Sequence, residues 1–206
     1  HDPFHAVVED GKLYGRGAAD MKGAVAAFTV AAHRYAVENG KNFAGDVYVA
    51  GVVHEECFEG VAARKISEKV KPDYVVIGEA SEMNLKVGQR GRAEIVVETF
   101  GVPAHSANQE RGVNAVYKMC EAIQAIREIE PPVQNKLGKG ILELTDVKSS
   151  PYPGASVVPE YCRATYDRRL LVGETKESVL QPIIEKMEEL KKKDPQFSYK
   201  VSYAVG

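Results

Sequence analysis

The stretch Gly15-Arg-Gly-Ala-Ala-Asp-Met-Lys-Gly23 decides how the first part of this chain can fold. Its three glycines allow positive φ and close packing, so a short loop can turn a side chain inward. The loop brings Asp20 to the start of an apolar run over residues 21–38, which is typical of a helix. An Asp at this place could simply cap the helix. Before the loop we expect an irregular segment over residues 1–11 and a short strand over residues 12–14.

Acidic residues also follow two apolar segments that are typical of buried strands. Residues 46–53 (DVYVAGVV) precede Glu55 and Glu56, and residues 74–77 (YVVI) precede Glu79. A helical segment between them predicts a parallel, doubly wound sheet, in which ligands bind at the carboxyl ends of the strands. A Glu-Glu pair taken alone more often points to solvent, and Glu79 could be a helix cap. The prediction of a metal site therefore depends on Asp20 and these acids together.

The pattern changes near Gly88. From there, alternating strands and amphipathic helices follow in the order β-α-β-β-α-β, which is the ferredoxin-like plan. We therefore expect an α/β protein with two domains, residues 1–87 with the candidate metal site and residues 88–206 with the ferredoxin-like plan. The expected elements of the second domain are strands over residues 92–100, 140–148, 158–167 and 197–203, and helices over residues 114–130 and 174–193.

The composition narrows the class of function. The 206 residues are 44% hydrophobic and 27% charged, with a formal net charge of −2, as is usual for globular domains. This weak acidic balance gives no reason to expect nucleic acid or a membrane as a partner. The apolar run over residues 23–32 is too short to span a bilayer. Three cysteines, at 57, 120 and 162, form no disulfide framework, and their odd number fits a reducing, cytoplasmic setting.

Several segments together resemble a known family. They are DPFHAVVEDGKLYGRGAADMKG, VVHEECFEG, VIGEAS, GQRGRAEI, GVPAHSANQERGVNA and the VVPE…YDRRL stretch. In this order they resemble the dizinc metallopeptidase and deacylase family that includes acetylornithine deacetylase, succinyl-diaminopimelate desuccinylase, aminoacylase and glutamate carboxypeptidase. The resemblance covers almost the whole chain. Within the family, the sequence also resembles a branch named for hydrolases of selenium metabolism.

The resemblance implies a metal site in residues 1–87. Asp20 matches the carboxylate that bridges two zinc ions, while Glu56 matches a ligand of one ion and Glu79 a ligand of the other. Glu55 matches the general base. Such a donor set suits Zn²⁺ or Co²⁺, and two metal ions can activate a water and polarise an amide carbonyl. The implied reaction is hydrolysis of an N-acyl amino acid or a small peptide.

The resemblance also implies that residues 88–206 form a lid and a homodimer interface. His105 matches a lid histidine that stabilises the developing oxyanion in the active site of the partner subunit. Arg169 matches an arginine that holds a substrate carboxylate, for which the guanidinium fork is suited. Without the resemblance, His105 would be read as a loop hydrogen-bonder and Arg169 as a surface cation beside Asp167.

The sequence departs from the family pattern in three places. A His and an Asp on an upstream strand would precede His1, and a last ligand His would follow Gly206, so we expect the middle of a longer enzyme. The chain alone is then expected to bind zinc weakly and to show no turnover. Ser156 stands where the family usually has Asn, which alters the expected substrate contacts there.

Two other functions compete with the amidohydrolase. An incomplete, non-catalytic dimerisation fragment of such an enzyme would keep the same residues without the reaction. A nucleotide-binding fold that uses Gly15-Arg-Gly17 is the weaker alternative, because no long strand with G-x-G-x-x-G spacing precedes it and no acid stands where a ribose would need one.

Overall fold

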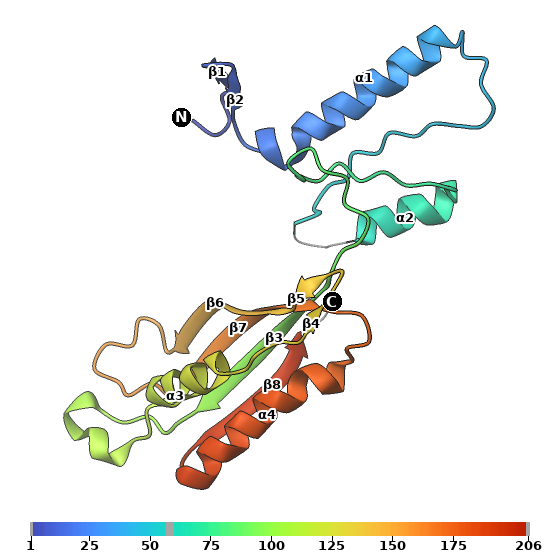
Figure 1. Ribbon diagram of the computed structural model, residues 1–206. Coiled ribbons are helices and arrows are strands. Elements are labelled where there is room, and N and C mark those ends of the chain that lie inside the picture. Colours follow the sequence, from blue (N-terminus) through green and yellow to red (C-terminus); the bar gives the residue numbers. More distant parts are fainter. Residues whose placement is uncertain (1, 57–59, 205–206) are drawn as a thin grey trace. The chain divides into compact units, whose positions relative to one another are not determined.

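The computed structural model describes residues 2–56 and 60–204. The chain divides into two compact units, His1–Lys86 and Val87–Gly206 (Figure 1). Among the described residues, every buried hydrophobic side chain lies in the second unit. The second unit therefore carries the hydrophobic core, and the first carries the acids singled out in the sequence.

The second unit is a four-stranded antiparallel sheet with two helices on one face (Figure 1). Its strands, in the order β6-β7-β3-β8, place the first strand of the unit next to the last. This arrangement confirms the ferredoxin-like plan and the α/β class. The strands are β3 (Gly91–Phe100), β6 (Ile141–Ser150), β7 (Tyr161–Leu170) and β8 (Ser198–Ala204), the helices are α3 (Ala115–Arg127) and α4 (Lys176–Lys193), and a small ribbon is formed by β4 (Val133–Gln134) and β5 (Gly138–Lys139).

Side-chain caps determine where the two helices begin. The Asn114 side chain accepts hydrogen bonds from the first turn of α3, and Thr175 forms a capping box with Ser178 at the start of α4. Both caps satisfy N–H groups that the helix itself leaves without partners. Helix α3 ends at Arg127, three residues earlier than the sequence predicted, because the chain turns before Pro131-Pro132.

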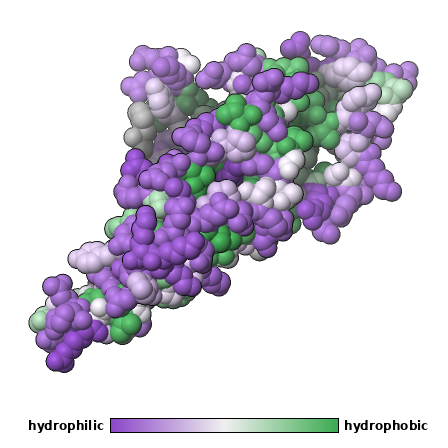
Figure 2. All heavy atoms as spheres, turned by 60° about the horizontal axis from the view of Figure 1, so that its bottom comes forward, coloured by the Kyte–Doolittle hydropathy of each residue, from purple (hydrophilic) through white to green (hydrophobic). Residues whose placement is uncertain are grey.

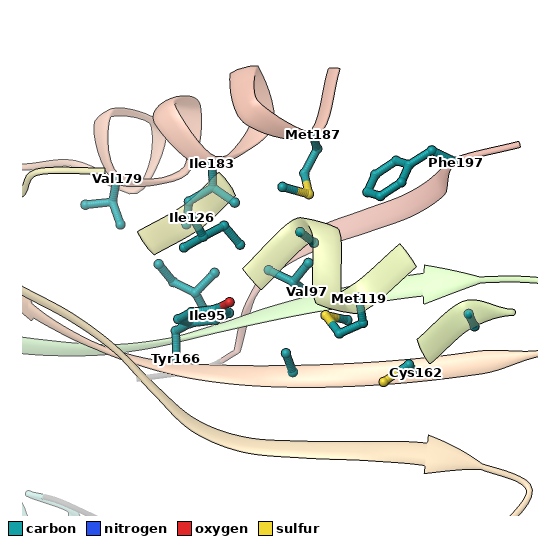
Figure 3. Close-up of a cluster of buried hydrophobic side chains, with 13 residues drawn as sticks. Ile95, Val97, Met119, Ile126, Cys162, Tyr166, Val179, Ile183, Met187 and Phe197 are labelled. Carbon is teal, nitrogen blue, oxygen red and sulfur yellow. The ribbon is translucent and has the colours of Figure 1, made fainter. Parts of the chain in front are cut away.

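The core lies between the sheet and the two helices (Figure 3). Val179, Ile183 and Met187 recur every four residues, so α4 turns one apolar side toward the sheet. Ile95 and Val97 alternate with outward residues on β3 and meet that side. The buried members of this core are Ile95, Val97, Ala115, Met119, Ala122, Ile126, Cys162, Ala164, Tyr166, Val179, Ile183, Met187 and Phe197.

The first unit holds a hairpin and two helices. Strands β1 (Val7–Glu9) and β2 (Lys12–Tyr14) pair antiparallel, followed by η1 (Ala18–Lys22), α1 (Gly23–Glu38) and α2 (Val61–Val70). The prediction of an irregular segment over residues 1–11 was therefore wrong at β1. Asp10 and Gly11 both have positive φ, 50° and 73°, as a two-residue hairpin turn requires.

The two strands expected before the acids are absent among the described residues of the first unit. Residues 46–53 and 74–77 form no strand pairing, and Val53 and Ile77 are 74% and 68% exposed. The prediction of two buried strands was wrong for this structure. A parallel strand is held by ladder hydrogen bonds to its neighbours, and neither segment belongs to any of the sheets formed by the described residues.

Surface features agree with the composition. Hydrophilic residues make up most of the face drawn in Figure 2, and hydrophobic residues appear between them in separate groups. None of the helices in the described part of the chain is long and apolar enough to cross a membrane. Cys120 and Cys162 are free thiols, and Cys57 lies outside the described residues.

Candidate metal and substrate site

The glycine-rich loop leaves Asp20 available for a ligand. Gly17 takes a left-handed φ of 76°, and its carbonyl accepts the Lys22 N–H at 2.8 Å. Asp20 itself has extended backbone angles (φ −124°, ψ 99°), and the Asp20–Met21 peptide bond is cis. Helix α1 has no side-chain cap at its N-terminus. The capping role that the sequence also allowed for Asp20 is thus not used.

The segment that carries Glu79 lies directly against α1. A Cβ built on Gly78 would come within 2.7 Å of the Ala24 Cβ, 2.8 Å of Phe28 and 2.9 Å of Met21. Real side chains do not tolerate such approaches, so the contact requires glycine at this position. Since Met21 follows Asp20 directly, the contact brings Glu79 to the same end of α1 as Asp20.

Electrostatics link four acids of the first unit. Glu79 is exposed, yet its pKa is raised, first by the loss of some solvent around the carboxylate and then by the negative charges of Asp20, Glu55 and Glu56. Neighbouring carboxylates repel each other when ionised, and this repulsion raises the pKa. The acids that follow two different apolar segments therefore share one neighbourhood with Asp20.

The described carboxylates of the first unit are suitable metal ligands by their chemistry, but they lie too far apart for three of them to coordinate one metal ion. Carboxylate oxygens are ligands that Zn²⁺ accepts, and a cation would relieve the repulsion at Glu79. Among the residues described, no three His, Cys, Asp or Glu side chains come close enough to hold a metal ion. Asp20 and Glu56 each lie near enough to Glu79 for their charges to act on it, but in the described part of the chain these three expected ligands form no coordination shell.

His105 lies in the second unit, in a loop before η2 (Ser106–Arg111). It forms a bridge to Val157, and the Ser106 N–H donates to the Ser156 carbonyl at 3.0 Å. The His105 Nδ1 accepts the Ala107 N–H at 3.1 Å. A neutral imidazole that accepts through Nδ1 carries its proton on Nε2, so the exposed ring offers a donor to a ligand.

Ser156, which replaces the family's usual Asn, has a left-handed φ of 57°. Asn adopts this conformation more readily than Ser does. The conformation of the loop is therefore the one the family residue favours, while the longer amide side chain is missing.

Arg169 lies on β7, half-buried, and forms an ion pair with Asp167. Its Nε donates to Asp167 Oδ2 at 2.7 Å, while Arg92 Nε on β3 donates to Asp167 Oδ1 at 2.7 Å. Burial acts to raise the pKa of Asp167, but the two hydrogen bonds and the two positive charges outweigh it, and the pKa is lowered. The sequence analysis missed the part played by Arg92. Asp167 lies two residues before Arg169 and therefore on the same face of β7. This spacing could have indicated that Asp167 binds cations on that face.

The comparisons with known sequences agree on one family. Residues 87–195 match the peptidase dimerisation domain. The chain is 32% identical over 186 residues to the uncharacterized protein YgeY of Escherichia coli, covering 88% of this chain and 46% of that protein. It is 30% identical over 195 residues to succinyl-diaminopimelate desuccinylase of Marinobacter nauticus, covering 89% of this chain and 51% of the relative. The chain thus spans about half the length of the curated relatives it matches.

Solved structures show the same fold. Human carnosine dipeptidase 1 matches all of this chain and 57% of its own, with a TM-score of 0.65 at 19% identity. Aminopeptidase PepT of Bacillus cereus matches 98% of this chain and 53% of its own, with a TM-score of 0.58 at 18% identity. Both likenesses extend over the two units.

Proposed function

The chain belongs to the peptidase and deacylase family that carries the peptidase dimerisation domain, and on this premise we propose that it is a metal-dependent hydrolase of amide bonds. The substrate class is an N-acyl amino acid or a small peptide. One relative is named a desuccinylase and two structural neighbours are named a dipeptidase and an aminopeptidase, and these names support an amide substrate.

One observation carries the proposal, namely the common neighbourhood of Asp20, Glu55, Glu56 and Glu79. The close contact of Gly78 with α1 supports it independently of charge. The negative charges of Asp20, Glu55 and Glu56 all act on Glu79, and a cation beside Glu79 would offset their effect. A cation site is the function that accounts for this arrangement best.

In the proposed site, Asp20, Glu56 and Glu79 would hold two zinc ions, for which cobalt could substitute. When bound, the metal pair lowers the pKa of a shared water and polarises the scissile carbonyl. Glu55 would serve as the general base toward the attacking water and as the proton donor to the leaving amine. This role requires Glu55 to stand outside the ligand set.

Two residues of the second unit act on the substrate. His105 would donate its Nε2–H, in the active site of the partner subunit, to the oxygen that gains charge as the carbonyl is attacked, and its Nδ1 contact with Ala107 leaves Nε2 to carry the proton. Arg169 binds a free carboxylate of the substrate through its guanidinium. A substrate without that carboxylate should therefore bind poorly.

We also propose that the protein is a homodimer through residues 88–206 and that it works in the cytoplasm. The matched domain is named for dimerisation. Strand β6 is an edge of the sheet with ten residues, and an edge strand offers backbone groups for pairing with another chain. The odd number of cysteines supports the cytoplasmic setting.

The experiment that tests the proposal is an assay of zinc-loaded complete gene product on a panel of N-acyl amino acids and dipeptides. We expect hydrolysis in the wild type and a loss of at least about a hundredfold in kcat for Glu55→Gln, with zinc content unchanged. Glu82→Gln removes a charge from an exposed acid outside the cluster and is the matched control. A Glu55→Gln variant as active as the control would contradict the role of Glu55.

A second candidate is a dimerisation module without catalysis. It is favoured by the lack of a three-ligand group in the described residues and by a core confined to the second unit. On this reading the 206-residue chain forms a dimer in sedimentation experiments, binds zinc weakly and hydrolyses nothing. The complete gene product separates the two candidates, because only the hydrolase retains zinc and turns over amides.

A further inference from the structure

Hydrophobic packing does little to hold the glycine-rich loop that carries Asp20. The loop lies between β2 and α1 (Figure 1), and residues 15–23 are all exposed or half-buried. Burial of apolar surface is what usually fixes a segment of chain in one conformation. The position of Asp20 therefore depends on hydrogen bonds and close contacts within the loop itself.

Lys22 binds the part of the loop before Asp20 at two points. Its backbone N–H donates to the Gly17 carbonyl at 2.8 Å, and its side-chain Nζ donates to the Arg16 carbonyl at 2.9 Å. The second bond is charge-assisted, because its donor is an ammonium group, and such bonds are stronger than neutral ones. Both bonds connect residue 22 with residues on the other side of Asp20, so they close a ring of chain that contains Asp20.

The aliphatic part of the Lys22 side chain also covers Gly17. A Cβ built on Gly17 would lie 3.2 Å from Lys22 Cε, 3.3 Å from Lys22 Cδ and 3.4 Å from the carbonyl oxygen of Asp20. Gly17 thus packs against the Lys22 side chain and the Asp20 peptide at once. This contact links the side chain of Lys22 to the backbone of Asp20 directly, beside the two hydrogen bonds.

The ring is also anchored to the segment before it. The Arg16 N–H donates to the Pro3 carbonyl at 2.6 Å, while the Arg16 carbonyl accepts from Lys22 Nζ. The peptide groups on both sides of Arg16 are therefore held, one by the segment that precedes β1 and the other by Lys22. Loss of the Lys22 ammonium would release the second of these and open the ring on that side.

Given the metal-dependent hydrolase proposed above, on which this step rests, we propose that Lys22 is a positioning residue for the metal ligand Asp20. Lys22 holds the peptide that carries Asp20 through the carbonyls of Arg16 and Gly17, and it binds neither the metal nor the substrate. A lysine two residues from a metal ligand requires such a reason, because its positive charge repels the metal ions.

The sign of the effect on zinc affinity separates position from charge. Lys22→Met keeps a long apolar side chain over Gly17 and removes the ammonium. If Lys22 acted by its charge alone, zinc would bind more tightly to the variant, because one repelling charge is lost. Because Lys22 holds Asp20 in place, we expect the zinc affinity of the complete gene product to fall by about fivefold or more. Competition with a zinc-binding dye measures it.

Two further variants and a metal-free measurement complete the test. Lys22→Arg keeps a cationic donor and should restore zinc affinity to within about twofold of the wild type. Lys12→Met is the matched control, since Lys12 is an exposed lysine on β2 of the same unit, and it should change the affinity by less than about twofold. In the metal-free protein, the amide hydrogen of residue 22 should exchange about threefold faster in Lys22→Met than in Lys12→Met, because the ring opens more often.

Three results would overturn the inference: zinc affinity in Lys22→Met equal to or above that of the wild type, an equal loss in Lys12→Met, or no recovery in Lys22→Arg. The hydrolase function fails separately. If the wild type binds zinc and Lys22→Met binds it more weakly, while the zinc-loaded gene product hydrolyses nothing, the role of Lys22 stands and the reaction does not.

Discussion

Gly78 packs against Ala24 so closely that a Cβ on Gly78 would lie 2.7 Å from the Ala24 Cβ. The contact fixes the peptide that leads into Glu79 against the first turns of α1. It links two parts of the first unit that are more than fifty positions apart in the sequence, and the proposed metal site depends on it.

Gly78→Ala should disturb this link. The added methyl overlaps three side chains, and such overpacking costs about 1 to 3 kcal/mol. We expect faster amide hydrogen exchange in α1 and a lower zinc content of the complete gene product. Gly51→Ala is the control, since nothing lies within 4 Å of its built Cβ and its φ is not positive. Equal exchange rates in the two variants would show that the contact does not hold the segment.

Tyr166→Phe should leave the second unit as stable as the wild type or more stable. Tyr166 is 2% exposed, and its hydroxyl finds no hydrogen-bond partner among the described residues. Removing a buried hydroxyl without a partner can gain about 1 kcal/mol. In Tyr161→Phe, by contrast, the bond to Glu98 at 2.7 Å is lost, and stability should fall by about 1 kcal/mol. Urea unfolding of both variants checks the opposite signs.

Glu174→Ala should be strongly destabilising. Glu174 pairs with Arg168, whose side chain is 5% exposed, and it also accepts the Leu171 N–H at 2.7 Å. Removing Glu174 leaves a buried guanidinium without its counter-charge, which costs about 3 kcal/mol. Glu121→Ala, on the exposed side of α3, should change the free energy of unfolding by less than about 0.5 kcal/mol. A small effect of Glu174→Ala in thermal unfolding would argue against the ion pair.

The bonds from Arg92 and Arg169 to Asp167 should make stability depend on acidic pH. The pKa of Asp167 is lower in the folded chain than in the unfolded one, so its stabilising contribution is present above the unfolded pKa and is lost as the pH falls through the folded pKa. Asp167→Asn should therefore be less stable than the wild type at pH 7. The difference between the two should shrink in unfolding curves recorded below about pH 4. A constant difference across this range would contradict the shift.

The second unit could be predicted from sequence because each of its elements carries its own signal. Ile95 and Val97 alternate along a strand, Val179 and Ile183 repeat at helical spacing, and Asn114 marks a helix start. The register between strands leaves no such local signal. The pairing of Arg92 with Arg169 was for that reason not foreseen.

The first unit was less predictable for two different reasons. The Asp10-Gly11 turn is a recognised hairpin signal and could have revealed β1. Residues 46–53 and 74–77, in contrast, are apolar enough for strands, but a strand forms only where a neighbouring strand provides hydrogen bonds. The local sequence does not reveal whether such a neighbour is present. The charges of Asp20, Glu55 and Glu56 act on Glu79, and the metal site at these acids stays a prediction.

The most direct test of the central claim is the zinc content of the complete gene product after dialysis, compared between the wild type, Glu79→Gln and Glu82→Gln. If Asp20, Glu56 and Glu79 share a metal site, Glu79→Gln loses zinc while Glu82→Gln keeps the wild-type amount. Equal zinc in all three proteins, or none in the wild type, would contradict the account.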